Sequence, residues 1–197
     1  QELWRREAVW TDTLTPEELK RWTDWLPNLP LMEELQFRRV LIPCLPDDHE
    51  SVQIHVFADA SERASACASY IRVTYKDGRP VYTNFIQAKC NIAPIKVKRT
   101  IPKLELMGIH SAARLADNLC RILDIPKEDA TLWSDSKTAL QWLRMEPTTL
   151  LPLVHNYSQK IKGFFPVDQI RWVPGEHNVA DVATRPKTVK ELLDLAQ

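Results

Sequence analysis

The stretch that decides the fold is VQIHVFADAS, residues 52 to 61. Apolar side chains recur along it at every second position, at Val52, Ile54, Val56 and Ala58. A period of two is typical of a β-strand with one buried face. Asp59 stands where the alternation ends, so we expect its carboxylate at the carboxyl edge of a sheet. Taken alone, Asp59 is either a turn former or part of a functional site.

The chain that follows predicts an α/β domain. Two further strands, 67–75 and 81–89, are joined across Asp77-Gly78, a dipeptide typical of hairpin turns. Apolar residues at spacings of three and four then predict a helix from near Pro102 to before Pro126. We expect the remaining elements to be a strand at 130–134, helices at 136–145 and 151–165, a strand at 169–173 and a helical region after Asn178. Three antiparallel strands followed by α/β alternation predict a five-stranded mixed sheet flanked by helices.

The first 51 residues differ in character from this domain. Thr15-Pro16 and Glu18 form an N-cap, a first-turn proline and a capping box, so a helix is expected to begin there. Prolines then punctuate residues 27–46, as in a connector. Four of the seven tryptophans lie at 4, 10, 22 and 25, and we expect them to be buried against this domain or another one. We therefore divide the chain into a helical, proline-rich linker at 1–51, a domain at 52–186 and a helical tail at 187–197.

Composition narrows the functional classes. Basic and acidic residues number 26 each, so any nucleic-acid role must rest on local patches rather than on a basic excess. No apolar run approaches the ~20 residues that a membrane span needs. The four cysteines form no CxxC pair, which suits neither a zinc site nor a disulfide framework and favours a reducing compartment. The chain begins at Gln1 without a signal-like segment, so we expect a fragment of a longer intracellular protein.

Four acidic residues fall where this layout would bring them together. Asp59 ends the first strand, Asp135 follows the fourth, Glu105 is placed in the first turn of the long helix, and Asp181 in the first turn of the last. Each has a structural interpretation as a helix cap, a turn former or an acid favoured by a helix dipole. Four anions in one cleft, however, repel one another and favour a hard divalent cation, Mg²⁺ or Mn²⁺.

The motifs FADAS, TIPKLEL, SDSKTALQWL and WVPGEHNVADVATRP occur in this order and on these elements. Together they resemble the ribonuclease H domain of retroelement reverse transcriptases, most closely the Pao/BEL type of long-terminal-repeat retrotransposon. The resemblance covers about residues 52 to 186 and implies a ribonuclease H-like fold. Residues 1–51 are similar in character to the linker that follows the polymerase in such polyproteins.

The resemblance implies a function as well. The family hydrolyses the RNA strand of RNA/DNA hybrids, leaving 3′-hydroxyl and 5′-phosphate ends, with two Mg²⁺ or Mn²⁺ ions about 4 Å apart. Its four metal ligands carry over to Asp59, Glu105, Asp135 and Asp181. His177 corresponds to a histidine that helps product departure in relatives, although the loop here is shorter. Contacts to nucleic acid are expected from Ser61, Lys96, Lys98, Arg99, Thr100 and Lys103.

The same resemblance implies partners and a location. We expect an upstream reverse transcriptase polymerase in the same polyprotein, a cytoplasmic retrotransposon particle, and no membrane association. The segment from Met145 to Leu150 carries no lysine or arginine, so weak hybrid binding by the isolated chain is expected.

Other functional classes are less well supported. The main alternative is a catalytically silent or host-adopted module that binds nucleic acid or protein without cutting. An integrase would need a third acid for which Glu146 is poorly placed, and no Asp-Thr/Ser-Gly motif of an aspartic peptidase is present.

Overall fold

The computed structural model describes residues 2–43, 48–95, 99–185 and 187–196, without the side chains of 195 and 196. The chain forms two compact units, one of residues 38–185 and one of residues 1–37 with 186–197. The division predicted at residues 52 and 186 stays a prediction. The larger unit holds the sheet and the acidic residues, so it is described first.

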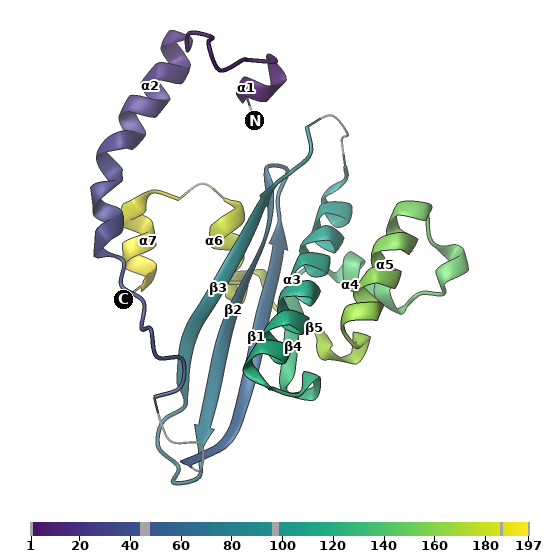
Figure 1. Ribbon diagram of the computed structural model, residues 1–197. Helices are drawn as coiled ribbons and strands as arrows, with labels where there is room; N and C mark the ends of the chain where they lie inside the picture. Colours follow the sequence, from purple (N-terminus) through teal and green to yellow (C-terminus); the bar gives the residue numbers. More distant parts are fainter. Residues whose placement is uncertain (1, 44–47, 96–98, 186, 197) are drawn as a thin grey trace. The chain divides into compact units, whose positions relative to one another are not determined.

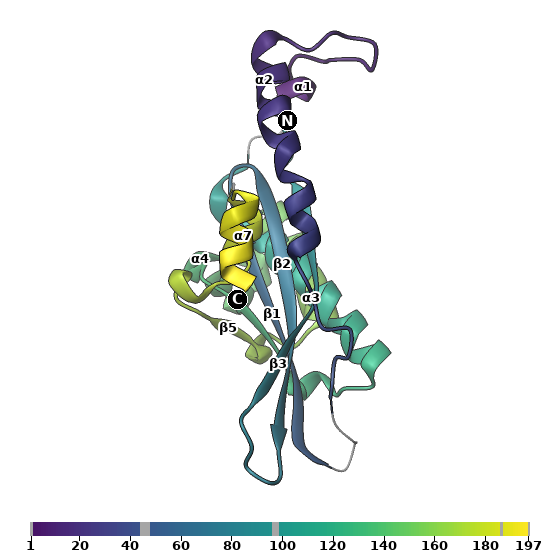
Figure 2. The ribbon, with the colours of Figure 1, turned by 90° about the vertical axis from the view of Figure 1, so that its left-hand side faces the viewer.

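A five-stranded mixed sheet forms the larger unit (Figure 1). Its strands are β1 (His49–Ala60), β2 (Ala64–Tyr75), β3 (Tyr82–Ile92), β4 (Ala130–Ser134) and β5 (Ile170–Trp172). The order across the sheet is β3-β2-β1-β4-β5; the pairs β1–β2 and β2–β3 are antiparallel, and the pairs β1–β4 and β4–β5 are parallel. This confirms the predicted fold class. Figure 2 shows the strong twist of the three long strands.

The first strand lies at the centre of the sheet, and from Ile54 onward its alternating pattern buries one face. Ile54, Val56 and Ala58 are at most 1% exposed. Because β1 also pairs in parallel with β4, Ala58 lies opposite Ser134. An aspartate follows Ala58, and another follows Ser134, so Asp59 and Asp135 lie at the same end of the sheet.

Helices cover both faces of the sheet. The helices α3 (Ile101–Leu123), α4 (Lys137–Arg144) and α5 (Pro152–Phe164) lie on one face, and α6 (Asp181–Thr184) lies on the other against β1 and β2 (Figure 1). Short 3-10 turns are η4 (Lys127–Asp129), η5 (Pro147–Thr149), η6 (Val167–Gln169) and η7 (Gly175–His177). In the described parts of the chain, no helix has the length and apolar character to cross a membrane.

The long helix α3 is bounded by local signals. Thr100 is its N-cap residue and Pro102 lies in its first turn, where a missing N–H is harmless. It ends at Asp124, whose left-handed φ of 54° lets its N–H reach the carbonyl of Cys120. Because the helix begins at Ile101, Glu105 lies beyond the first turn, and the predicted first-turn position was wrong.

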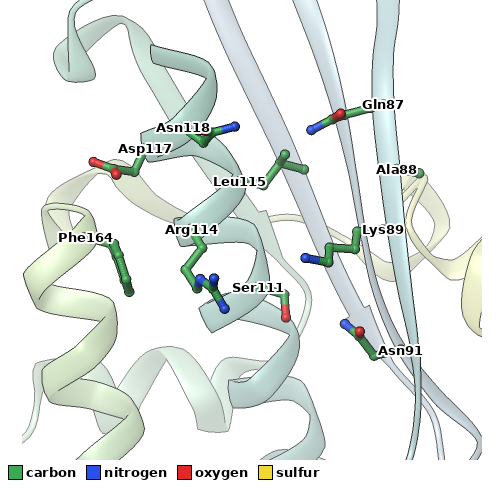
Figure 3. A pocket seen from close by; sticks show the side chains of 10 residues that line it. All are labelled: Gln87, Ala88, Lys89, Asn91, Ser111, Arg114, Leu115, Asp117, Asn118 and Phe164. Carbon is green, nitrogen blue, oxygen red and sulfur yellow. The ribbon is translucent and has the colours of Figure 1, made fainter. Parts of the chain in front are cut away.

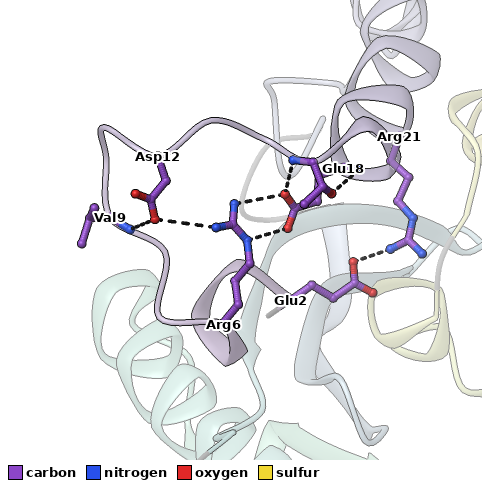
Figure 4. A network of polar contacts seen from close by, with 7 residues as sticks. Glu2, Arg6, Val9, Asp12, Glu18 and Arg21 are labelled. Carbon is purple, nitrogen blue, oxygen red and sulfur yellow. Dashed lines mark hydrogen bonds and ion pairs between the residues drawn. The ribbon is translucent and has the colours of Figure 1, made fainter.

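The smaller unit contains α1 (Glu2–Arg5), α2 (Pro16–Trp25), η1 (Leu26–Asn28), η2 (Pro30–Glu34) and α7 (Val189–Ala196). The capping box of Thr15 and Glu18 is confirmed at the start of α2. Figure 4 shows Glu18 also accepting two hydrogen bonds from Arg6, of 2.9 and 3.1 Å, while Glu2 pairs with Arg21. These polar contacts fasten the first turns of the chain to α2.

The expected burial of the early tryptophans is not seen against the described residues. Trp4, Trp10, Trp22 and Trp25 are each at least 46% exposed. The rings of Trp22 and Trp25 lie 5.5 Å apart and contact each other instead of a core.

One glycine marks where α3 comes closest to β1. A Cβ at Gly108 would lie 3.0 Å from the main-chain oxygen of Asp59, whereas a Cβ at Gly163 in α5 would meet nothing within 4 Å. Gly163→Ala should therefore stabilise the protein by up to about 0.5–1 kcal/mol, because alanine favours the helix. Gly108→Ala should lose that gain and destabilise. Urea midpoints of the two variants check this; an equal gain at both positions would show that the close approach is unimportant.

Candidate active site

Three carboxylates from separate elements meet at the carboxyl end of β1. Asp59 comes from β1, Glu105 from α3, and Asp135 from the turn after β4. Each offers an oxygen, and these oxygens all lie within 4.8 Å of one another. Asp59 is 4% exposed, Glu105 is 7% exposed, and Asp135 is partly buried. The convergence predicted from the sequence therefore holds for these three residues.

Two acids, Asp135 and Glu105, do not have the purely structural roles that the sequence allowed, a helix cap and a first-turn acid. The N-cap of α4 is Ser136, whose hydroxyl accepts the N–H of Ala139, so Asp135 is not the capping residue. Glu105 is not in the first turn of its helix, and its Oε2 is buried without a hydrogen-bond partner among the described residues. A buried carboxylate oxygen left without a donor is costly unless something else satisfies it.

The electrostatics of the cluster reflect this burial. Burial, and after it the negative charges of Asp59 and Asp135, together raise the pKa of Glu105 to about 9. Burial also raises the pKa of Asp59, while the hydrogen bond from Thr184 acts in the opposite direction. The cluster therefore disfavours its own negative charge in the absence of a counterion.

A divalent metal ion fits this donor set. The cluster offers only oxygen ligands, which are the donors that Mg²⁺ and Mn²⁺ prefer. The unpartnered Oε2 of Glu105 gives the same indication, because a cation would satisfy it and favour the ionised carboxylate. The three acids are thus a potential divalent-metal site.

The fourth predicted acid lies outside this cluster. Asp181 is the first residue of α6, and its carboxylate forms an ion pair of 2.6 Å with Arg185, one turn further on. Its charge nevertheless acts on the site, since it contributes to the raised pKa of Glu105. The structure places Asp181 beside the cluster, with its side chain held by another partner.

Two further residues support the carboxylates, and the sequence did not single them out. The hydroxyl of Thr184 in α6 donates to Asp59. The amide of Asn178 donates to the carbonyl of Ala58 over 2.9 Å and to Oδ1 of Asp135 over 3.3 Å. Both residues are buried, at 4% exposed each. In the sequence each lies three residues from Asp181, and this spacing could have pointed to them. The same spacing, however, is equally typical of turn and helix-cap residues.

A groove adjoins the cluster on the side of α4. The indole N–H of Trp172 donates to the main-chain oxygen of Asp135 over 3.2 Å, and Lys137 lies 4.7 Å from the centre of the indole ring. The groove has a volume of about 420 Å³ and is lined by Lys137, Leu140, Gln141, Arg144 and Trp172. Exposed aromatic and basic side chains beside an acidic centre are suited to a nucleic-acid strand.

The other predicted site residues differ in their exposure and in their hydrogen-bond partners. His177 is exposed on η7, and Thr100 is exposed at the start of α3. The hydroxyl of Ser61 donates to the carbonyl of Thr184 over 2.9 Å. The guanidinium of Arg99 contacts the sulfur of Met107, and Lys103 is partly buried. Lys96 and Lys98 fall outside the described residues. The roles of all seven stay predictions.

A sheet of this order with acidic residues at the carboxyl ends of its central strands is a ribonuclease H-like domain. The sequence matches the family model described as "Pao retrotransposon-like RNaseH-like domain" over residues 1–136. The chain belongs to this family. The matched segment includes residues 1–51 and ends beside Asp135, so Asn178, Asp181 and Thr184 lie beyond it.

Solved structures with a similar fold are distant in sequence. The N-terminal RNase H domain of Rv2228c from Mycobacterium tuberculosis is 17% identical, with 74% of this chain and 96% of that chain covered and a TM-score of 0.42. RNase H1 from Halobacterium salinarum is also 17% identical, covering 73% and 97%, with a TM-score of 0.42. LC11-RNase H1, solved with an RNA/DNA hybrid, is 14% identical, covering 72% and 99%, with a TM-score of 0.44. No curated protein matches the sequence.

The raised pKa of Glu105 predicts a dependence of stability on pH. Between its unfolded value of 4.5 and about 9, folded Glu105 keeps a proton that the unfolded chain has lost. The metal-free protein should therefore lose stability as pH rises through this window. Glu105→Gln removes the titration, so the variant should be more stable than the parent at pH 8 by on the order of 1 kcal/mol or more, and similar at pH 5.

Urea unfolding in the presence of a chelator at both pH values measures this. Exposed Glu128 supplies a matched control, since Glu128→Gln should keep the pH dependence of the parent. An unchanged pH dependence in Glu105→Gln would contradict the assignment.

Proposed function

We propose that this chain is a divalent-metal-dependent endonuclease that hydrolyses the RNA strand of RNA/DNA hybrids during retrotransposon reverse transcription. The observation that carries the proposal is the convergence of Asp59, Glu105 and Asp135. Within this cluster, the buried Oε2 of Glu105 has no hydrogen-bond partner among the described residues. Membership of a retrotransposon-like RNaseH-like family supports the choice of substrate. Two Mg²⁺ or Mn²⁺ ions are proposed, held by these three acids and by Asp181.

The residues of the chain would contribute in distinct ways. Bound divalent ions would lower the pKa of the attacking water and neutralise charge on the scissile phosphate. Asp59 and Glu105 hold their carboxylates in a buried setting that limits competing water. Thr184 and Asn178 fix the orientations of Asp59 and Asp135, as hydrogen bonds to metal ligands do in metal sites generally. The products would carry 3′-hydroxyl and 5′-phosphate ends.

The hybrid would extend from the carboxylates over the adjoining surfaces. The groove of Trp172 and Lys137 offers an aromatic face and a cation next to Asp135, where a nucleotide beside the scissile phosphate would lie. Thr100, Arg99, Lys103, Lys96, Lys98 and Ser61 are proposed as further contacts. His177 is proposed to assist product release from its exposed position.

In its natural setting the domain is proposed to act beside a reverse transcriptase polymerase in the same polyprotein, within a cytoplasmic particle. Residues 1–51 would serve as the connection between the two, and the zero net charge of the chain agrees with affinity that is supplied in part from elsewhere.

Loss of a central carboxylate should abolish cleavage. Asp135→Asn should lower Mg²⁺-dependent hybrid cleavage by at least about 100-fold, because it removes a charged ligand from the cluster. A gel assay with a labelled RNA/DNA hybrid measures the rate, and Asp194→Asn on the smaller unit is the control of equal charge change. An unmodified chain that binds the hybrid without cutting it would favour the alternative of a silent binding module.

The ion pair of Asp181 predicts a graded effect. Because Arg185 already holds this carboxylate, Asp181→Asn should reduce cleavage less than Asp135→Asn and should chiefly raise the Mg²⁺ concentration needed for half-maximal rate, by about 10-fold. Mg²⁺ titrations of both variants make the comparison. Equal losses at saturating Mg²⁺ would show that Asp181 contributes as much as the central three acids.

A further inference from the structure

A second groove lies between β3 and the C-terminal half of α3, apart from the carboxylates. It encloses about 520 Å³ (Figure 3). Its lining residues are Gln87, Ala88, Lys89 and Asn91 from β3, Ser111, Arg114, Leu115, Asp117 and Asn118 from α3, and Phe164 from α5. None of them belongs to the cluster of Asp59, Glu105 and Asp135. Along α3 the groove begins at Ser111, about 9 Å of helix rise beyond Glu105.

Two facing rows of polar side chains form its walls. On β3, alternate residues share a face, so Gln87, Lys89 and Asn91 all point toward α3. Cys90, between them, contacts Ala183 on the opposite side of the sheet. On α3, the spacing of three and four residues aligns Ser111, Arg114 and Asn118 along one stripe. Between the rows lies the buried side chain of Leu115.

The charge of the groove is positive. Lys89 and Arg114 have no side-chain hydrogen bond or ion pair within the described parts of the chain. The one acid, Asp117, pairs with Lys127 over 2.5 Å and points away from the sheet in Figure 3. Arg121 donates to Oδ1 of Asn118 over 2.6 Å, which leaves the amide nitrogen of Asn118 directed toward β3. Two unpaired cations are therefore concentrated here in a chain of zero net charge.

We propose that this groove binds a single nucleic-acid strand through its phosphodiester groups. Lys89 and Arg114 would meet phosphates, while the amides and the hydroxyl donate to and accept from sugars and base edges. The ring of Phe164 offers an apolar surface at the α5 end. The groove, of about 520 Å³, has room for a segment of one strand between its two walls. An acidic peptide would satisfy the cations but would leave the amides of both walls and the aromatic ring with less to recognise.

This inference does not depend on catalysis. Binding at the groove requires neither the carboxylates nor a metal ion, and it applies to DNA as well as to RNA. It can therefore be tested with a DNA strand and a chelator present, whether or not the chain cleaves hybrids.

The experiment measures binding of a 5′-fluorescein 12-mer of oligodeoxythymidylate to the full chain by anisotropy, at several salt concentrations with a chelator. The double variant Lys89→Gln/Arg114→Gln should bind about tenfold more weakly at low salt. The slope of log K against log salt should become shallower by about 1.4, since each lost phosphate contact on a single strand removes about 0.7. The control of equal charge change is Lys20→Gln/Lys190→Gln, at exposed positions in α2 and α7, and it should match the parent.

Two further measurements keep the result decisive. The swap Lys89→Arg/Arg114→Lys preserves both charges and should keep the slope of the parent, which separates loss of contact from loss of fold. Equal slopes in the groove variant, the control and the parent would overturn the proposal. Equal competition by a deca-glutamate peptide would overturn it in favour of an acidic peptide.

Discussion

The parallel pairing of β1 with β4 is the constraint on which the site depends. Alternation along β1 buries Ile54, Val56 and Ala58, and a one-residue slip would turn these side chains to the other face. In the observed register against β4, Ala58 lies opposite Ser134. The residue that follows on each strand is an aspartate, so the register that completes the core also juxtaposes two negative charges. The close approach of α3, which Gly108 permits at the main chain of Asp59, then adds Glu105 to the same place.

That arrangement is unfavourable by itself. Three carboxylates within 4.8 Å, two of them buried, raise the pKa of Asp59 and Glu105 and leave an oxygen of Glu105 without a donor. The surrounding hydrogen bonds from Thr184 and Asn178 hold the aspartates in place but do not neutralise them. A fold that maintains such repulsion is suited to a divalent cation, which the proposed hydrolysis of a phosphodiester would need. Of the four predicted acids, Asp181 is the one whose carboxylate already has a cationic partner, Arg185.

Charge distribution, rather than net charge, directs where nucleic acid would lie. Balanced totals of 26 basic and 26 acidic residues conceal a positive groove between β3 and α3 and a basic, aromatic groove beside Asp135. In the groove between β3 and α3 the one acid, Asp117, pairs with Lys127, so Lys89 and Arg114 are available to a ligand. In the smaller unit, by contrast, the tryptophans are exposed and charged side chains pair with one another, as Arg6 does with Glu18.

The sequence by itself determined the strands, the long helix, the mixed sheet and the identity of the three central acids, because periodicity and capping act over a few residues. It placed Glu105 in the first turn of α3, whereas Glu105 lies just beyond that turn. It did not reveal Asn178, Thr184, Trp172 or the facing rows of Gln87 to Asn91 and Ser111 to Asn118. Those depend on contacts between residues far apart in the chain, such as Thr184 with Asp59. Asp181 and Arg185 are one turn apart, so their ion pair is local. Only the tertiary structure decided that Asp117 pairs with Lys127 and so leaves its groove positive, because the partner of such a side chain depends on how whole elements pack.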